Sequence, residues 1–120
     1  MSRLEKKFHN RKVIITGHTG FKGSWLVAWL KELGAHVTGI SLDPPTDPSH
    51  FLVAQLERGI QDLRIDLRHH KTLEQTIKDV QPDFIFHLAA QSLVRKSYSD
   101  PVSTYSTNVM GTLHLLGGLR

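Results

Sequence analysis

The chain contains no cysteine, which excludes disulfide bonds and thiolate metal sites. It also lacks an apolar run near the roughly 20 residues that a membrane-spanning helix needs. No apolar segment follows the basic N-terminal residues in the manner of a secretory signal. Of its 120 residues, 39% are hydrophobic and 22% are charged, which is typical of a globular domain. We therefore expect one cytoplasmic domain over residues 1–120, with no membrane partner.

Two catalytic patterns are missing as well. The sequence has no Gly-x-Ser-x-Gly elbow, so nothing favours a hydrolase of that type. It has eight histidines, but the adjacent His69 and His70 would point apart on a helix, and no pair with helical spacing completes a ligand set. We expect no metal site.

The net charge of +4 raises the question of a nucleic-acid partner. A basic cluster precedes the first apolar run, but the other basic residues are scattered among acids without interleaved aromatic residues. We therefore expect no nucleic-acid binding. A positive charge would also attract an anionic nucleotide ligand.

Three evenly spaced glycines lie in the segment Thr16-Gly17-His18-Thr19-Gly20-Phe21-Lys22-Gly23. A β-branched strand over 12–16 precedes them, and an amphipathic helix is expected after Gly23. A strand, a glycine-rich turn and a helix in this order present backbone N–H groups to a pyrophosphate. The segment is not a Walker A loop, because Lys22 is followed by glycine instead of by serine or threonine.

An aspartate ends the second predicted strand, which covers 36–43. Asp43 lies twenty residues beyond Gly23, where a dinucleotide site places a carboxylate that accepts hydrogen bonds from the adenosine ribose. The alternative is a turn aspartate before Pro44. Together with the glycine turn, the ribose role is favoured. No arginine follows directly to bind a 2′-phosphate, so NAD is preferred over NADP.

The first two helices are predicted from their apolar spacing. The helix after Gly23 should end at Gly34 and place Trp25, Leu26, Trp29, Leu30 and Leu33 on the sheet. A short helix over 49–56 follows.

The second half of the chain has clear start and stop signals. A strand is expected over 60–66. A helix should then begin at a Thr72–Gln75 capping box and end before Pro82. A buried strand over 84–88 follows. Asp100 and Pro101 should start the last helix, whose core side is Val102, Tyr105, Val109, Leu113 and Leu116.

Strands and helices thus alternate, which predicts an α/β fold. Right-handed crossovers give a Rossmann-type, doubly wound parallel sheet with strand order 3-2-1-4, truncated relative to the six-stranded form. The glycine turn lies at the edge of the sheet where the strand order reverses, between the first and fourth strands. Asp66 ends the third strand there and is either an adenine ligand or a turn residue. Ala89 and Ala90 follow the fourth strand. Their small side chains either let a flat ring or a phosphate approach the backbone or simply relieve packing.

In these motifs, and in the segments 87–91 and 105–112, the chain resembles the extended short-chain dehydrogenase/reductase superfamily. Within it, the segments 16–23, 42–46 and 105–112 look like the family of CDP-glucose 4,6-dehydratases. His18 and Lys22 carry most of that finer resemblance, because most relatives have small or apolar residues there.

The resemblance implies a lyase that uses NAD as a redox catalyst. In the family, C4 of the glucosyl unit is oxidised, water is eliminated across C5 and C6, and hydride returns to C6. CDP-glucose thereby becomes CDP-4-keto-6-deoxyglucose, a precursor of bacterial surface polysaccharide. The alternatives are an NAD-dependent nucleotide-sugar epimerase or reductase, and a non-catalytic dinucleotide-binding module.

The resemblance also implies site residues. The cofactor-binding set is Gly17, His18, Thr19, Gly20, Phe21, Lys22, Gly23, Asp43, Asp66, Leu67, Leu88, Ala89 and Ala90, with His18 and Lys22 adding polar or cationic contacts near the pyrophosphate. Gln91 and Asn108 would lie nearest the sugar. Arg95 and Lys96 either reach a phosphate or are solvated.

The family's Tyr-x-x-x-Lys pair is missing: Val102 follows Tyr98 at that spacing, and Val109 follows Tyr105. We therefore expect an N-terminal portion of such an enzyme, without a catalytic residue or the substrate domain, and inactive alone. The full-length family member is expected to be a homo-oligomer.

Overall fold

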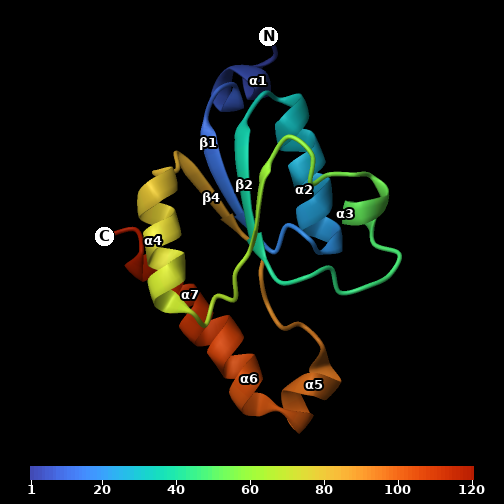
Figure 1. The fold of residues 1–120 in the computed structure, drawn as a ribbon, viewed down its shortest axis with the longest axis vertical. Coiled ribbons are helices and arrows are strands. Elements are labelled where there is room, and N and C mark those ends of the chain that lie inside the picture. Colours follow the sequence, from blue (N-terminus) through green and yellow to red (C-terminus); the bar gives the residue numbers. More distant parts are fainter.

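Four parallel strands form the centre of the computed structural model, which describes all residues 1–120 (Figure 1). They lie in the order β3-β2-β1-β4, so the predicted topology is confirmed. Their bounds are β1 (Lys12–Thr16), β2 (His36–Ser41), β3 (Gln61–Arg64) and β4 (Phe84–His87). The last residue of β1, Thr16, pairs with Ile40 of β2 and with His87 of β4. The carboxyl ends of the strands therefore meet at one edge of the sheet.

Helices cover both faces of the sheet (Figure 1). One face carries α2 (Phe21–Glu32) and α3 (His50–Val53), and the other carries α4 (His70–Val80) and α7 (Gly111–Gly117). A short α1 (Arg3–Phe8) precedes β1 and buries Phe8 in the first layer. Because side chains alternate along a strand, β1 sends Val13 and Ile15 into the α2 layer and Ile14 into the α4 layer. All three are fully buried.

The chain after β4 leaves the sheet and returns through a series of helical segments. These are α5 (Val94–Ser99), α6 (Pro101–Tyr105), a π-helical turn η1 (Ser106–Met110) and α7. Segments α6, η1 and α7 continue one another with helical backbone angles. The predicted start is confirmed, since the Asp100 side chain accepts a hydrogen bond from Ser103 N at 3.1 Å and Pro101 is the first helical residue. Helix α5 was not predicted.

The prediction that Trp25 and Trp29 pack on the sheet is wrong. Their side chains are 56% and 57% exposed, and α2 instead buries Gly23, Ser24, Val27 and Leu30. The helix is apolar on more than one side, so periodicity does not fix its rotation. The close approach of Gly23 to Gly17 does fix it, and this contact turns the tryptophans outward.

The predicted core side of the last helix is also wrong. The stripe exists, but Val102, Tyr105, Val109, Leu113 and Leu116 are all exposed. The helix instead buries Gly111 and Leu115. Leu115 joins Leu67 and Ile77 in the core of the α4 layer.

Several predicted boundaries differ from those observed. Helix α2 begins at Phe21, so Gly23 lies inside its first turn. Helix α4 begins at His70, and the Thr72 capping box does not form. Strands β2, β3 and β4 each end before the last residue predicted for them, because the chain turns away from the sheet at the candidate site. No helix combines the length and apolar character needed to cross a membrane.

Candidate functional site

A pocket of about 220 Å³ lies where the carboxyl ends of the four strands meet. Open α/β sheets bind ligands at this edge, at the point where the strand order reverses. The glycine turn and the segments after β2, β3 and β4 all contribute to the lining. Among the predicted site residues, those that line it are Gly17, Thr19, Gly20, Asp43, Asp66, Leu67, Leu88, Ala89 and Ala90. Outside the lining are His18, Phe21, Lys22, Gly23, Gln91 and Asn108.

The glycine turn is packed so closely that two of its glycines leave no space for a side chain. Gly17 has a φ of +76°, and a Cβ there would lie 2.7 Å from Ala89 N. A Cβ on Gly23 would overlap the carbonyl of Gly17. Gly20 is different, because the nearest atom to a Cβ there is Gly17 O at 3.4 Å. Gly17 and Gly23 therefore build the turn, and Gly20 keeps its outer surface open.

Helix α2 begins at this turn with unpaired backbone donors. Gly20 is its N-cap and provides no side-chain cap. The N–H groups of Phe21 and Lys22 have no acceptor within the chain, since the first returning bond is Ser24 N to Gly20 O at 2.9 Å. The N-terminus of a helix carries a partial positive charge that favours anions. The exposed Lys22 adds a full positive charge to the same turn.

Thr16 links the ends of β1 and β4 through its buried hydroxyl. Its Oγ1 accepts hydrogen bonds from Leu88 N (3.1 Å) and Ala89 N (3.2 Å) and lies 2.6 Å from His87 Nδ1. On the other side of the ring, His87 Nε2 lies 2.9 Å from Thr112 Oγ1, whose hydrogen is donated to Asn108 O. Nε2 must therefore donate to Thr112, and Thr16 must donate to Nδ1. This chain of bonds requires a neutral His87.

The two predicted substrate residues contact each other beside this network. Gln91 N donates to Asn108 Oδ1 at 2.7 Å, and Asn108 Nδ2 donates to Gln91 O at 2.9 Å. The Gln91 side chain continues to Thr104 Oγ1 at 3.0 Å. Asn108 lies in the π-helical turn η1, and the irregular helix therefore fixes the segment that leaves β4.

Asp43 lies at the pocket wall after β2, and its side chain is 90% exposed. Its Oδ1 accepts a hydrogen bond from Arg64 Nη1 at 2.8 Å. The sequence alone does not indicate Arg64, because this residue does not directly follow Asp43 in the chain. The missing information was the parallel pairing of β2 with β3, which places Arg64 beside Ser41.

The expected side-chain contact of His18 with the cofactor is corrected by the structure. Its ring is fully buried under the turn, and Nε2 lies 2.6 Å from Asp62 Oδ1. Burial lowers the pKa of His18, and the Asp62 carboxylate opposes that shift. Burial raises the pKa of Asp62, but the hydrogen bonds from Arg64 and His18 hold it below its usual value.

Asp66 lines the pocket with a carboxylate that is already paired. Both oxygens accept hydrogen bonds from the Arg68 side chain, and Oδ1 also accepts one from Arg68 N at 2.9 Å. The side-chain bond to Arg68 lowers the pKa of Asp66. The group is therefore an ionised hydrogen-bond acceptor at neutral pH.

The buried His18 and the half-buried His87 should make the chain less stable as the pH falls. Burial lowers the pKa of both His18 and His87 in the folded state, whereas in the unfolded chain they take up protons near pH 6.5. The unfolded state therefore binds more protons below about pH 6.5, and the free energy of unfolding should decrease as the pH falls from about 7.5 to 5.5.

Urea unfolding at several pH values measures this dependence. His87→Gln should flatten it, and His36→Gln, at an exposed position of β2, is the matched control. A midpoint that is constant or rises as the pH falls would contradict the prediction.

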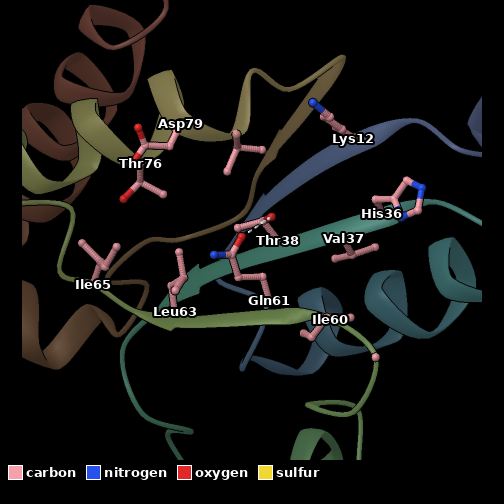
Figure 2. A pocket seen from close by; sticks show the side chains of 12 residues that line it. Lys12, His36, Val37, Thr38, Ile60, Gln61, Leu63, Ile65, Thr76 and Asp79 are labelled. Atoms are coloured by element: carbon pink, nitrogen blue, oxygen red, sulfur yellow. Dashed lines mark hydrogen bonds between the residues drawn. The ribbon is translucent and has the colours of Figure 1, made fainter.

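A larger cavity lies elsewhere and has no catalytic grouping. It measures about 630 Å³ and separates α4 from β2 and β3, near the amino ends of the strands (Figure 2). In Figure 2, Thr76 and Asp79 of α4 lie across the gap from Thr38 and Gln61. Asp79 accepts a hydrogen bond from Gln75 at 2.8 Å. Because ligands of such sheets bind at the opposite edge, the smaller pocket is the candidate site.

Residues 14–120 match the GDP-mannose 4,6 dehydratase family. The chain belongs to this family. Its relatives include the CDP-glucose 4,6-dehydratase of Salmonella typhimurium, which is 50% identical over 94% of this chain and 32% of the relative. The GDP-mannose 4,6-dehydratase of Sordaria araneosa is 40% identical over 92% of this chain and 20% of the relative. The chain thus spans about a third or less of the length of these relatives.

A solved structure agrees with the fold. The UDP-glucose 4-epimerase of Thermus thermophilus, crystallised as a complex with NAD, superposes with a TM-score of 0.75 at 29% identity. The match covers 89% of this chain and 33% of the epimerase. The Rossmann-type assignment made from the sequence is confirmed.

Proposed function

We propose that residues 1–120 are the NAD-binding portion of a nucleotide-sugar 4,6-dehydratase that converts CDP-glucose to CDP-4-keto-6-deoxyglucose. The observation that carries the proposal is the uncapped N-terminus of α2, which meets the same pocket as Asp43. This arrangement combines an anion site with a diol acceptor, as a dinucleotide requires. The identity of 50% with a CDP-glucose 4,6-dehydratase supports the choice of sugar nucleotide.

The residues present fit NAD. The closely packed Gly17 and Gly23 leave the N–H groups of Phe21 and Lys22 free for the pyrophosphate. Asp43 would hold the adenosine ribose, and Asp66 with Leu67 would hold the adenine. When bound, NAD supplies the reversible electron acceptor that oxidation at C4 of the sugar needs. The small residues after β4, Ala89 and Ala90, would leave room beside the nicotinamide.

The sugar would lie beyond β4, near Gln91 and Asn108. Two hydrogen bonds to the Gln91 backbone orient the side-chain amide of Asn108, and Thr104 holds the side-chain amide of Gln91. Both amides would thereby position the hexose against the cofactor. The same proposal includes the complete reaction and its place in the cytoplasmic synthesis of surface polysaccharide. It also includes a homo-oligomer for the full-length enzyme.

The cofactor assignment is tested by calorimetric titration of the chain with NAD. Gly20→Val should weaken binding about tenfold or more, because its side chain would occupy the open surface before α2. The fold should persist, since a Cβ at Gly20 makes no contact closer than 3.4 Å. If the folded chain does not bind NAD at millimolar concentration, the assignment of NAD as the cofactor is refuted. Unchanged binding by Gly20→Val would refute the role of the turn.

The reaction is tested by incubating the complete gene product with CDP-glucose and NAD. A dehydratase releases one water, so mass spectrometry should show a product lighter by that mass. An epimerase is the alternative that the Thermus thermophilus structure favours, and it would leave the mass unchanged while inverting a carbon. NAD binding without turnover of CDP-glucose, UDP-glucose or GDP-mannose would favour a non-catalytic module.

A further inference from the structure

Arg64 connects the exposed wall of the pocket to the buried core. It is the last residue of β3 and pairs with Ser41 of β2, two positions before Asp43. Its Nη1 donates to Asp43 at 2.8 Å. On the other edge of the guanidinium, Nε and Nη2 donate to the two oxygens of Asp62, each at 3.1 Å. One arginine therefore holds two carboxylates.

The inner edge of the guanidinium is rigidly anchored. Asp62 Oδ1 also contacts the ring of His18, which is fully buried. The Arg64 Cζ lies 5.6 Å from the ring centroid of Phe51, another fully buried residue. An arginine held in plane at one edge presents its remaining N–H groups in a fixed geometry. Those groups belong to Nη1 and Nη2, on the side of Asp43.

The outer contact with Asp43 is not explained by stability. The side chains of Arg64 and Asp43 are 32% and 90% exposed, and exposed ion pairs add little to folding. The contact does determine the charge at the pocket wall. Two carboxylates against one guanidinium leave a net negative charge beside the position proposed for the ribose. That charge repels a 2′-phosphate and accepts hydrogen bonds from a free diol.

We propose that Arg64 determines the choice between NAD and NADP. While Asp43 is present, Arg64 orients its carboxylate toward the ribose, which favours NAD. When the charge of Asp43 is removed, the Nη1 and Nη2 donors become a preformed site for the 2′-phosphate of NADP. Arginine binds phosphate in this paired geometry more readily than lysine does. The inference rests on the proposed function, because it requires the ribose at Asp43.

Calorimetric affinities for NAD and NADP test the inference in wild type, Asp43→Asn, Arg64→Gln and the double variant. Asp43→Asn should bind NADP about 10- to 100-fold more tightly than wild type does, the range for hydrogen bonds to a charged group. It should bind NAD more weakly. The double variant should lose this increase in affinity for NADP. Arg64→Gln alone should weaken NAD binding without increasing the affinity for NADP.

Glu74→Gln is the matched control, because it also removes one carboxylate from an ion pair, with Lys78 on α4, away from the pocket. Thermal unfolding shows whether each variant is folded. If Arg64→Gln is unfolded, Asp43→Asn with Arg64→Lys replaces the double variant, and it should keep only part of the gain.

Three outcomes would overturn the inference. The affinity for NADP could fail to rise in Asp43→Asn, the rise could persist when Arg64 is also replaced, or Glu74→Gln could show an equal rise. Failure of wild type to bind NAD would refute the proposed function. A wild type that prefers NAD, combined with any of the three outcomes, would refute only the role of Arg64.

Discussion

Replacing Gly23 with alanine should abolish NAD binding and destabilise the chain. The added Cβ would overlap the carbonyl of Gly17, a backbone atom that cannot rotate away. Either α2 moves outward or the turn opens, and both changes displace the free N–H groups of Phe21 and Lys22. Overpacking of this kind costs about 1–3 kcal/mol. The NAD affinity should fall about 100-fold or more, because the anion site depends on the position of these donors. Urea unfolding and calorimetry measure the two effects.

Gly117→Ala is the matched control for that substitution. Both glycines lie in helices, where alanine is favoured by up to ~1 kcal/mol. No atom lies within 4 Å of a Cβ at Gly117. This variant should therefore be as stable as wild type or more stable, and it should bind NAD normally. If Gly23→Ala behaves in the same way, the close packing of the turn is not required for the site.

The sequence predicts the arrangement of the fold because its strongest signals are local. The β-branched run before Gly17, the apolar run over 84–88 and the Asp100–Pro101 start each specify one element. Right-handed crossovers then leave the order 3-2-1-4, which the structure has. The same rule brings the residues after all four strands to one edge. Most of the pocket lining, including Asp43 and Asp66, could therefore be predicted.

Helix orientation could not be predicted, because an apolar stripe shows that a face is apolar and not what covers it. Trp25 and Trp29 form a regular stripe on α2, yet the contact between Gly23 and Gly17 directs the opposite side to the sheet. The stripe of Tyr105 and Val109 is equally regular and equally exposed. In both helices, small residues at close contacts determine the buried side.

The network under the turn could not be predicted either, since its members are distant in sequence. His18 contacts Asp62 across 44 positions, and Arg64 contacts Asp43 across 21. The parallel registers of β1 with β2 and of β2 with β3 bring them together. The family resemblance implied a cofactor contact for His18, but its ring instead lies in the core beneath the turn, where it can support the turn.

Gly39 gives a direct test of that supporting role. It lies in β2 beneath the turn, and a Cβ there would overlap the ring of His18. The ring cannot withdraw, because Nε2 is bonded to Asp62 and Phe51 packs edge-on at 5.1 Å. Gly39→Ala should therefore reduce the free energy of unfolding by about 1–3 kcal/mol. Urea unfolding at neutral pH measures the loss.

The loss of stability caused by Gly39→Ala should depend on His18. His18→Ala removes the ring and makes space for the new methyl group, so Gly39→Ala should cost much less in that background. The coupling energy between contacting residues reaches about 0.5–3 kcal/mol in double-mutant cycles, whereas distant pairs add within about 0.5 kcal/mol. Gly117→Ala combined with His18→Ala provides the additive reference. If Gly39→Ala and His18→Ala are also additive, the ring does not fill the space above Gly39. The buried histidine would then not support the turn, and the lost stability would arise in β2 itself.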